Sequence, residues 1–174
     1  MVYCGYHVVD EKGGHVRSAK AVRPELRGRV FQELLLENRI SGSASAVLVR
    51  RSVLDTVGPF DEKLQGSEDW DMWLRIAENH AIDFVDEDLV AIRQHPGNAQ
   101  LDTDRMLRNM IRFYAKWFQV ARQHQDVCRY WGHLIAEFAL RSPDPIKARR
   151  ESNASLTNDM KRALFDRTGG SLSM

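Results

Sequence analysis

The sequence contains no long apolar segment, only two cysteines and almost no excess of charge, and each of these points excludes a class of protein. No apolar segment approaches the ~20 residues that span a bilayer, and Met1–Cys4 has neither the basic start nor the apolar middle of a signal peptide. Cys4 and Cys128 form no Cys-x-x-Cys motif, so we expect free thiols in a reducing cytoplasm. Lys and Arg number 25 against 24 Asp and Glu, a balance that does not favour nucleic acid as the main partner.

The composition is that of a soluble globular protein. Of the 174 residues, 43% are apolar and 28% are charged, which suits one domain with a sizeable core, or the larger part of one. The chain opens directly on an alternating strand, Val2–Val8, with no lead-in. We therefore expect that Met1 is not the natural start. We also expect that this strand and the strand at Ser43–Val49 have lost sheet neighbours, which would leave unpaired edges.

The first hundred residues alternate between strand and helix patterns. Turn residues at Asp10–Gly14 separate the first strand from a second near His15–Val22. Gly58 is expected to end a short helical segment in the αL conformation. The other elements expected here are a helix at Val30–Glu37, the strand at Ser43–Val49, helical turns at Ser52–Val57, and strands at Ile82–Val85 and Leu89–Arg93.

The apolar period becomes helical after Asp102. One apolar stripe runs from Met106 to Ala121, and a second, from Val127 to Phe138, ends before Pro143. Asp144-Pro145 suits the N-cap and first position of a final, weaker helix that reaches Leu164.

An acidic pair, Glu68-Asp69, opens a helix predicted for Glu68–Asn79, with Ser67 as its N-cap. Acidic residues stabilise the first turn of any helix by about 0.3–1 kcal/mol each, which alone would explain either residue. The pair also follows a small Gly66-Ser67 approach, where a ligand can come close to the backbone. A helix-start role and a catalytic role therefore both stay open. The helix dipole is expected to lower the pKa of such a carboxylate and make it a weak base.

Two further features are weaker signals. His95 follows a strand, where a single histidine is typically a surface residue or a satisfied hydrogen-bonding group. No second Cys or His lies at ligand spacing, so a metal here would need carboxylates from elsewhere. The small residues Gly42–Ala46 would permit close packing of a strand, and they do not have the glycine pattern of a phosphate loop.

Basic residues lie along one side of the helix that follows Asp102. They are Arg105, Arg108, Arg112 and Lys116. Such a row can contact anionic lipid or a phosphorylated acceptor, but a solvated helix face has the same pattern, and we favour that interpretation.

Taken in order, these residues resemble the second half of a family 2 glycosyltransferase of the GT-A fold, over roughly Val2 to Asn98. Each piece is weak alone, and the order and spacing of the pieces carry the resemblance. The pieces are a strand that ends in Asp10 with Gly13-Gly14 after it, the small-residue strand Ser43–Arg51, Val57–Glu62, Glu68–Arg75 and Ile92–His95. The resemblance implies an α/β fold. Residues 1–100 would form the acceptor-side half of a GT-A catalytic domain, a mixed sheet with flanking helices, and residues 101–174 a helical extension.

The resemblance also implies roles for particular residues. Asp69 would be the general base that deprotonates the acceptor hydroxyl, with Glu68 in support. The sugar would come from a nucleotide-sugar donor, and its configuration would invert in one displacement. His95 would help to hold a divalent metal, Mn²⁺ or Mg²⁺, on the diphosphate. The residues expected to line the substrate cleft are Gly42, Ser43, Ala44, Ser45 and Trp70.

The chain departs from the family in one respect. The Asp-x-Asp metal motif of the N-terminal half has no counterpart, because Asp69-Trp70-Asp71 stands at the Glu-Asp position. We therefore expect the main metal carboxylates to be absent from this chain and the isolated chain to be inactive. The implied partners are a nucleotide sugar and a glycan or lipid-linked acceptor, in the cytoplasm or at the inner face of the membrane. The alternative is a non-catalytic binding or interaction module that retains half of a GT-A fold.

Overall fold

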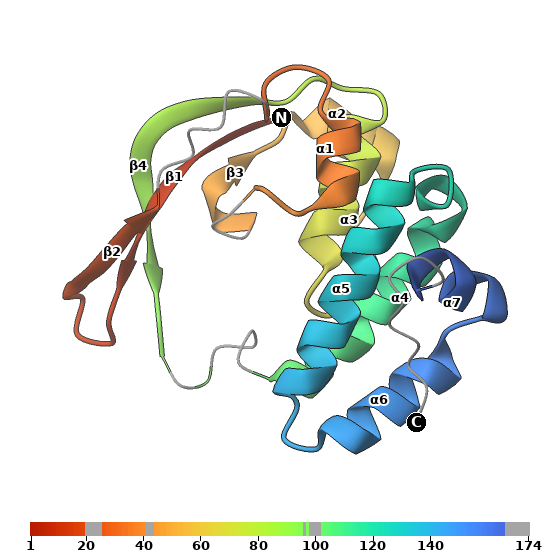
Figure 1. Cartoon of the computed structure of the whole chain (residues 1–174). Helices are drawn as coiled ribbons and strands as arrows, with labels where there is room; N and C mark the ends of the chain where they lie inside the picture. The colour runs from red at the N-terminus through yellow and green to blue at the C-terminus, as the bar shows by residue number, and fades with distance from the viewer. Residues whose placement is uncertain (20–25, 41–43, 96, 98–101, 166–174) are drawn as a thin grey trace. The chain divides into compact units, whose positions relative to one another are not determined.

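The computed structural model describes residues 1–19, 26–40, 44–95, 97 and 102–165. The chain forms two compact units (Figure 1). Unit 1 comprises Met1–Glu62 and Glu68–Asn98, and unit 2 comprises Lys63–Ser67 and Ala99–Met174. Unit 1 contains a mixed sheet with helices, which is the predicted α/β class.

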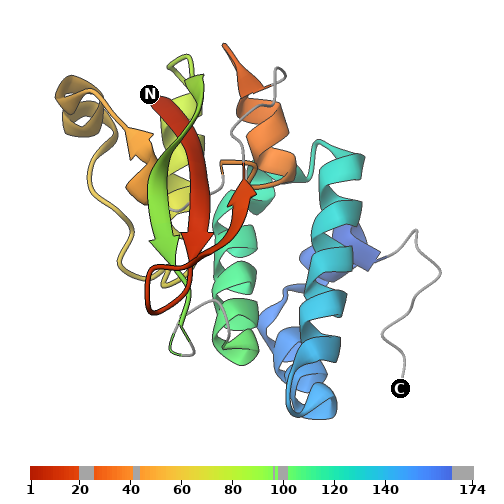
Figure 2. The same ribbon diagram turned by 90° about the vertical axis from the view of Figure 1, so that its left-hand side faces the viewer.

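Strand β1 (Val2–Val9) is the centre of the sheet in unit 1. β4 (Asp83–Arg93) runs parallel to it along its whole length, as Figure 2 shows. β2 (His15–Ala19) pairs antiparallel with the second half of β1, and β3 (Val47–Leu48) with its first residues. The prediction that the opening strand has lost its sheet neighbours is therefore wrong. β3 is short, and its Leu48 is 72% exposed, as expected of a strand at an open edge.

The two strands predicted around residues 82–93 are one strand, β4. Its pairing with β1 shifts register on both sides of Gly5, where Cys4 pairs with Val85, Gly5 with Asp88 and Tyr6 with Val90. The extra residues make bulges in β4. The charged run Asp86–Asp88 is accommodated at these bulges without ending the strand.

The helices of unit 1 are α1 (Phe31–Leu36), α2 (Arg51–Val57) and α3 (Glu68–Ala77). The strand predicted for Ser43–Val49 is shorter, because a 3₁₀ helix, η2 (Ala44–Ala46), replaces its start. α2 ends at Gly58, whose φ of 81° is positive as expected, although its ψ of −176° is not that of αL. α3 buries both tryptophans, and Trp70 Nε1 donates to the Leu34 carbonyl at 2.6 Å, which fixes α3 against α1.

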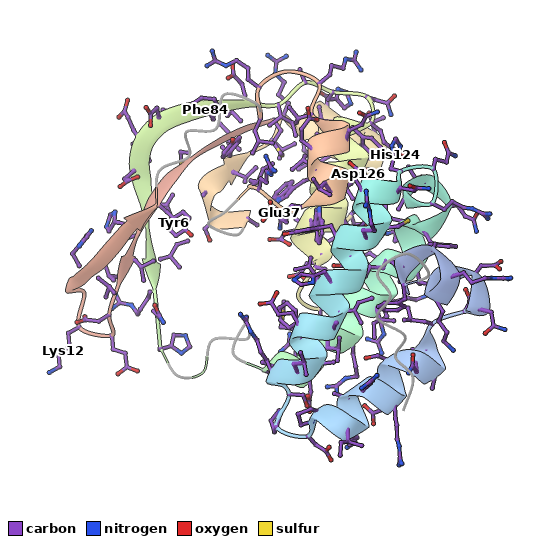
Figure 3. The ribbon with its side chains drawn as sticks, viewed as in Figure 1. Tyr6, Lys12, Glu37, Phe84, His124 and Asp126 are labelled. Carbon is purple, nitrogen blue, oxygen red and sulfur yellow. The ribbon has the colours of Figure 1, made fainter. Side chains whose placement is uncertain are left out.

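The turn between β1 and β2 has Lys12 near its tip (Figure 3). It is held by Asp10 and Arg93, which both belong to the pieces of sequence that resemble the family. Asp10 Oδ1 accepts from the backbone N–H groups of Lys12 and Gly14, at 2.9 and 2.7 Å. A Cβ at Gly14 would lie 2.8 Å from the Asp10 carboxylate, so a side chain does not fit there. Arg93 Nη1 donates to the carbonyls of Asp10 and Glu11. The end of β4 is therefore fixed to this turn.

Unit 2 is helical, with α4 (Thr103–Ala121), α5 (Gln125–Arg141), α6 (Pro145–Ser155) and α7 (Asn158–Phe165). Asp144 is an N-cap as expected and accepts from Lys147 N–H at 3.0 Å. Asp102 also caps its helix and accepts from Arg105 N–H at 2.9 Å. The core includes Trp131, which stacks on Tyr114 with ring centroids 4.3 Å apart. The final predicted helix is two helices. Leu156 is extended, and Thr157 Oγ1 accepts from Met160 N–H at the start of α7.

Cys4 and Cys128 are both free, as predicted. Burial, with a smaller contribution from Asp126, raises the pKa of the Cys128 thiol, so it is a poor nucleophile. Among the described helices, none is both long enough and apolar enough to cross a bilayer.

Gly132 of α5 packs closely against the backbone of α7. A Cβ there would clash with the Leu164 carbonyl oxygen, a backbone atom that cannot turn away. We expect Gly132→Ala to lower the free energy of unfolding by about 1–3 kcal/mol, although alanine is the better helix former. Urea unfolding of this variant and of His133→Ala, at the exposed neighbour on α5, measures the difference. The close-contact explanation does not hold if the two variants are equally stable.

Candidate functional site

The acidic pair lies in the first turn of α3, as predicted. Glu68 and Asp69 are both half-buried, and Asp69 Oδ1 accepts from Trp70 N–H at 2.6 Å. Gly66, just before the pair, has a φ of 129°, and a Cβ there would lie 2.9 Å from the Met106 sulfur. The glycine in this approach therefore has a structural reason within unit 2. A role for this glycine in admitting a ligand stays a prediction.

The electrostatics of Asp69 differ from the expectation based on the helix dipole. Burial raises the pKa of Asp69 above its ordinary value of 3.8, and the nearby Glu68 charge raises it further. The hydrogen bond from Trp70 N–H opposes this rise but does not outweigh burial. The prediction of a lowered pKa is therefore wrong. A carboxylate with a raised pKa binds a proton more readily, which makes Asp69 a better base than an exposed aspartate.

This raised pKa has a consequence for stability. The pKa of Asp69 is higher in the folded chain than in the unfolded chain, so the protonated side chain favours the folded state. Its contribution to the free energy of unfolding is fully present below pH 3.8 and is lost as pH rises through the folded-state pKa. We expect Asp69→Asn, which stays neutral, to melt at a higher temperature than the wild type at pH 7. This difference should shrink as pH falls towards 4. Thermal melts between pH 4 and pH 7, with Asp55→Asn as the control for a surface carboxylate, measure it. A lower melting temperature for Asp69→Asn at pH 7 would instead indicate a helix-start role.

Asp71 and Arg75, which also lie on α3, have a structural role that the sequence did not reveal. Asp71 is completely buried, and its Oδ2 lies 2.9 Å from Arg75 Nε. The other two guanidinium nitrogens donate to the carbonyls of Val57 and Pro59, at 2.7 and 2.9 Å. The pair therefore fixes α3 to the segment that follows α2. The only signal for it in the sequence was the i, i+4 spacing of opposite charges.

The predicted substrate residues are not brought together as one surface. Gly42 and Ser43 lie outside the described residues. Ala44 and Ser45 are exposed on η2. Trp70 is 6% exposed, and its indole N–H is bound to the Leu34 carbonyl, so the structure gives this ring a packing role. Contact of any of these residues with a substrate stays a prediction.

His95 is exposed and follows the end of β4. Its Nδ1 accepts from Gly97 N–H at 3.1 Å. Within the described part of the chain, no three His, Cys, Asp or Glu residues are grouped so that they could hold a metal ion. The described residues therefore do not form a metal site around His95, and its role as a ligand stays a prediction.

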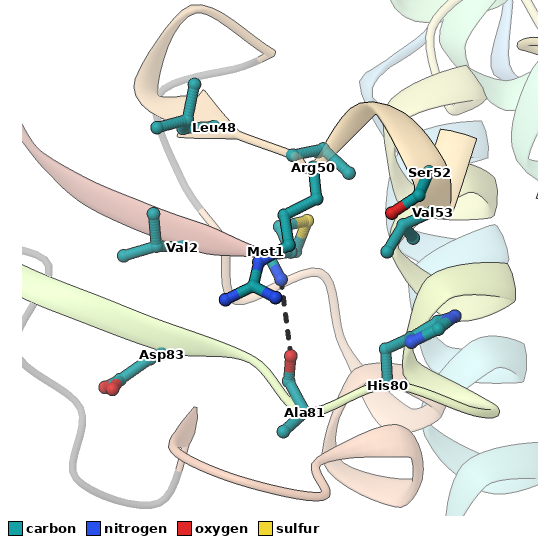
Figure 4. A pocket seen from close by; sticks show the side chains of 10 residues that line it. Met1, Val2, Leu48, Arg50, Ser52, Val53, His80, Ala81 and Asp83 are labelled. Atoms are coloured by element: carbon teal, nitrogen blue, oxygen red, sulfur yellow. Dashed lines mark hydrogen bonds between the residues drawn. The ribbon is translucent and has the colours of Figure 1, made fainter. Parts of the chain in front are cut away.

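One hollow in unit 1 is lined by none of the residues of the acidic pair. It has a volume of about 800 Å³ and lies beside the start of β1 (Figure 4). The Met1 ammonium donates to the Ala81 carbonyl at 3.3 Å, and burial, followed by the Arg50 charge, lowers the pKa of this ammonium. The lining also includes Leu48, Val53 and His80. None of the predicted site residues lines this hollow, and we assign no chemistry to it.

Comparison with known proteins gives a consistent family. Residues 1–137 match the family described as "Glycosyltransferase like family 2". The match extends past Asn98, where the resemblance seen in the sequence ended, through α4 and into α5. No solved structure gives a significant match.

Curated relatives come from Rickettsia. The chain is 26% identical over 119 residues to an uncharacterized glycosyltransferase of Rickettsia typhi, which covers 67% of this chain and 36% of that protein. It is 31% identical over 97 residues to an uncharacterized glycosyltransferase of Rickettsia conorii, which covers 55% of this chain and 16% of that protein. The chain therefore spans roughly a third or less of the length of these relatives.

Proposed function

Because this chain belongs to the glycosyltransferase-like family 2, we propose that the protein carrying it transfers a sugar from a nucleotide-sugar donor to an acceptor hydroxyl, with inversion at the anomeric carbon. Asp69 is the proposed general base, with Glu68 in support. The proposed acceptor is a glycan or a lipid-linked glycan. The family supports the transferase, whereas donor, acceptor and stereochemistry are parts of the proposal.

The observation that carries this proposal is the environment of Asp69. The carboxylate stands in the first turn of a helix whose apolar side is buried, so its backbone position is rigid. It is only half-buried, so solvent or an acceptor can reach it. Burial and the Glu68 charge raise its pKa, and both effects strengthen it as a base.

The proposed step transfers one proton and exchanges one bond. The Asp69 carboxylate takes the proton of the acceptor hydroxyl, and the hydroxyl oxygen forms a bond to the anomeric carbon. The bond from that carbon to the diphosphate oxygen breaks on the opposite face, so the configuration inverts. The nucleotide diphosphate leaves with the electron pair.

A divalent metal, Mn²⁺ or Mg²⁺, is part of the proposal only if a longer protein carries this chain. His95 has no cluster of partner ligands among the described residues, so no step of the mechanism is derived through a metal here. The main carboxylate ligands and the donor site are proposed to lie outside this chain. The proposal is compatible with the comparisons, because the chain spans only 36% and 16% of the length of the two Rickettsia relatives.

A transfer assay tests the proposal. The native protein, expressed with whatever sequence adjoins this chain in its genome, is incubated with a panel of nucleotide sugars and Mn²⁺, and nucleotide release is measured with and without acceptor glycans. The proposal expects acceptor-dependent release for at least one donor, and an inverted product by NMR. A protein that binds the acceptor but releases no nucleotide from any donor would favour the alternative, a non-catalytic binding module.

A further inference from the structure

A hollow with a volume of about 390 Å³ lies between α4 and α6 of unit 2. This size is within the range of small-molecule pockets, roughly 300–1,000 Å³. Every residue that lines the hollow belongs to one of these two helices, which pack against each other. The hollow is therefore formed within one compact unit, by side chains that project from regular helices.

Part of the wall of this hollow is apolar. Leu107 and Ile111 lie one turn apart on α4, Ala148 lies on α6, and all three are buried. Ser152 Oγ and Ser155 Oγ, on the α6 side, each donate at 2.8 Å to a carbonyl of their own helix. Their hydroxyl protons are thus already used, and they offer a ligand only acceptor lone pairs. A ligand that fits this wall needs an apolar part.

Charged side chains line the same hollow. Asp104 and Arg108 come from α4, and Glu151 comes from α6. Asp104 Oδ1 is buried and has no hydrogen-bond partner among the described residues. Asp104 and Arg108 have the i, i+4 spacing at which opposite charges commonly pair, yet within the described part of the chain no ion pair joins them. A buried acceptor without a donor is unfavourable, so a ligand that brings an N–H group to Asp104 would bind there favourably.

The balance of charge around the hollow indicates the class of ligand. Two acids and one arginine line it, and Lys147, whose Nζ lies 3.9 Å from Glu151 Oε1, offsets one of the acids. A simple cation would meet the like charge of Arg108, and a simple anion would meet that of Asp104. A molecule with one charge of each sign finds an opposite charge for both, because an ammonium donates to a carboxylate and a carboxylate accepts from a guanidinium.

The spacing of the two charged groups narrows this class further. Asp104 and Arg108 are one helical turn apart, so their Cβ atoms are separated by about 5–6 Å. Two charged groups of a ligand that reach both side chains must therefore be close together. In an α-amino acid the ammonium and the carboxylate are carried by one carbon atom, and a side chain on the same carbon can extend along the apolar wall.

We propose that the hollow between α4 and α6 binds an α-amino acid with an aliphatic side chain. The ammonium of the ligand contacts Asp104, its carboxylate contacts Arg108, and its side chain packs on Leu107 and Ile111. None of the residues proposed for sugar transfer lines this hollow. The proposal does not rest on that activity, so it can be tested on the 174-residue chain whether or not the chain is active.

NMR titrations with valine, leucine and isoleucine test this proposal, with the methyl signals of Leu107 and Ile111 as the readout. We expect saturable shifts with a Kd of about 1 mM for the best of the three, because an open pocket gives a small ligand only modest affinity. Two analogues of leucine each lack one charge. 3-Methylbutylamine keeps the ammonium and 4-methylpentanoate keeps the carboxylate, and each should bind roughly tenfold more weakly. No saturable shift with any of the three amino acids, or equal binding of leucine and both analogues, would overturn the proposal.

Two variants assign the charged contacts separately. Asp104→Asn should weaken leucine binding by about tenfold and leave 4-methylpentanoate unchanged, whereas Arg108→Gln should weaken leucine binding by about tenfold and leave 3-methylbutylamine unchanged. Asp126→Asn and Arg129→Gln are matched controls at exposed positions of α5 outside the hollow, and both should bind leucine as the wild type does. Equal losses in the controls would overturn the assignment to this hollow. If circular dichroism shows that Asp104→Asn does not fold, the analogues with the wild type and Arg108→Gln still decide the outcome.

Discussion

Asp69→Asn is expected to lower sugar transfer by roughly 10²–10⁴-fold, with donor binding nearly unchanged. Asparagine keeps the size of the side chain and an oxygen that can still accept from Trp70 N–H, the bond that spans 2.6 Å in the structure. It removes only the ability to take a proton. The loss should therefore fall on kcat and not on the affinity for the nucleotide sugar. The measurement is steady-state transfer by the native protein that carries this chain.

Two variants control this experiment. Glu78→Gln removes an exposed carboxylate just beyond the end of α3 and should leave transfer within about twofold. Glu68→Gln should give a smaller loss than Asp69→Asn, because Glu68 acts through its charge on Asp69. Full activity in Asp69→Asn would remove Asp69 as the base, and Glu68 would then be the first residue to test.

Asp71→Ala is expected to lower the free energy of unfolding by about 3–5 kcal/mol, the largest stability effect that the structure predicts. The substitution leaves Arg75 beside an emptied, fully buried position, while its other nitrogens still hold the carbonyls of Val57 and Pro59. A partly buried guanidinium that loses its carboxylate is costly. Urea unfolding followed by tryptophan fluorescence is a suitable measurement, because Trp70 and Trp73 lie on the same helix.

The chain offers a matched control in the exposed pair Arg51–Asp55 on α2. This pair has the same i, i+4 spacing, and its side chains are 89% and 61% exposed. Asp55→Ala should cost no more than about 0.5 kcal/mol. If the two substitutions cost the same, burial is not what makes the Asp71–Arg75 pair important.

The sequence was sufficient for elements whose pattern is local. The helices at α4 and α5 follow from their apolar period, and Asp144 was identified as a cap because a cap acts within three residues. The break between α6 and α7 was also local but was missed. Thr157, followed by Asn158 and Asp159, is a helix start that the weak apolar pattern concealed.

The sequence was insufficient where distant segments decide the outcome. Two strands, Ile82–Val85 and Leu89–Arg93, were predicted where there is one, because the tolerance of the intervening residues as a bulge depends on pairing with Gly5, far away in the chain. The raised pKa of Asp69 depends on burial by other segments, which the helix dipole argument does not include. The acidic pair could be located from sequence, whereas its electrostatics required the fold.

The pairing of β1 with β4 has a further consequence, for the order in which the chain folds. Their register joins Val2 to Asp83, so a loop of about 80 residues must close before the central strand has its parallel neighbour. Loop closure of this length is entropically costly, and folds with such contacts form slowly. The helices of unit 2 pack mainly against neighbours close in sequence, such as α4 on α5 and α5 on α6. During synthesis, the edge of β1 that pairs with β4 therefore stays without this partner until the residues of β4, Asp83–Arg93, have been made.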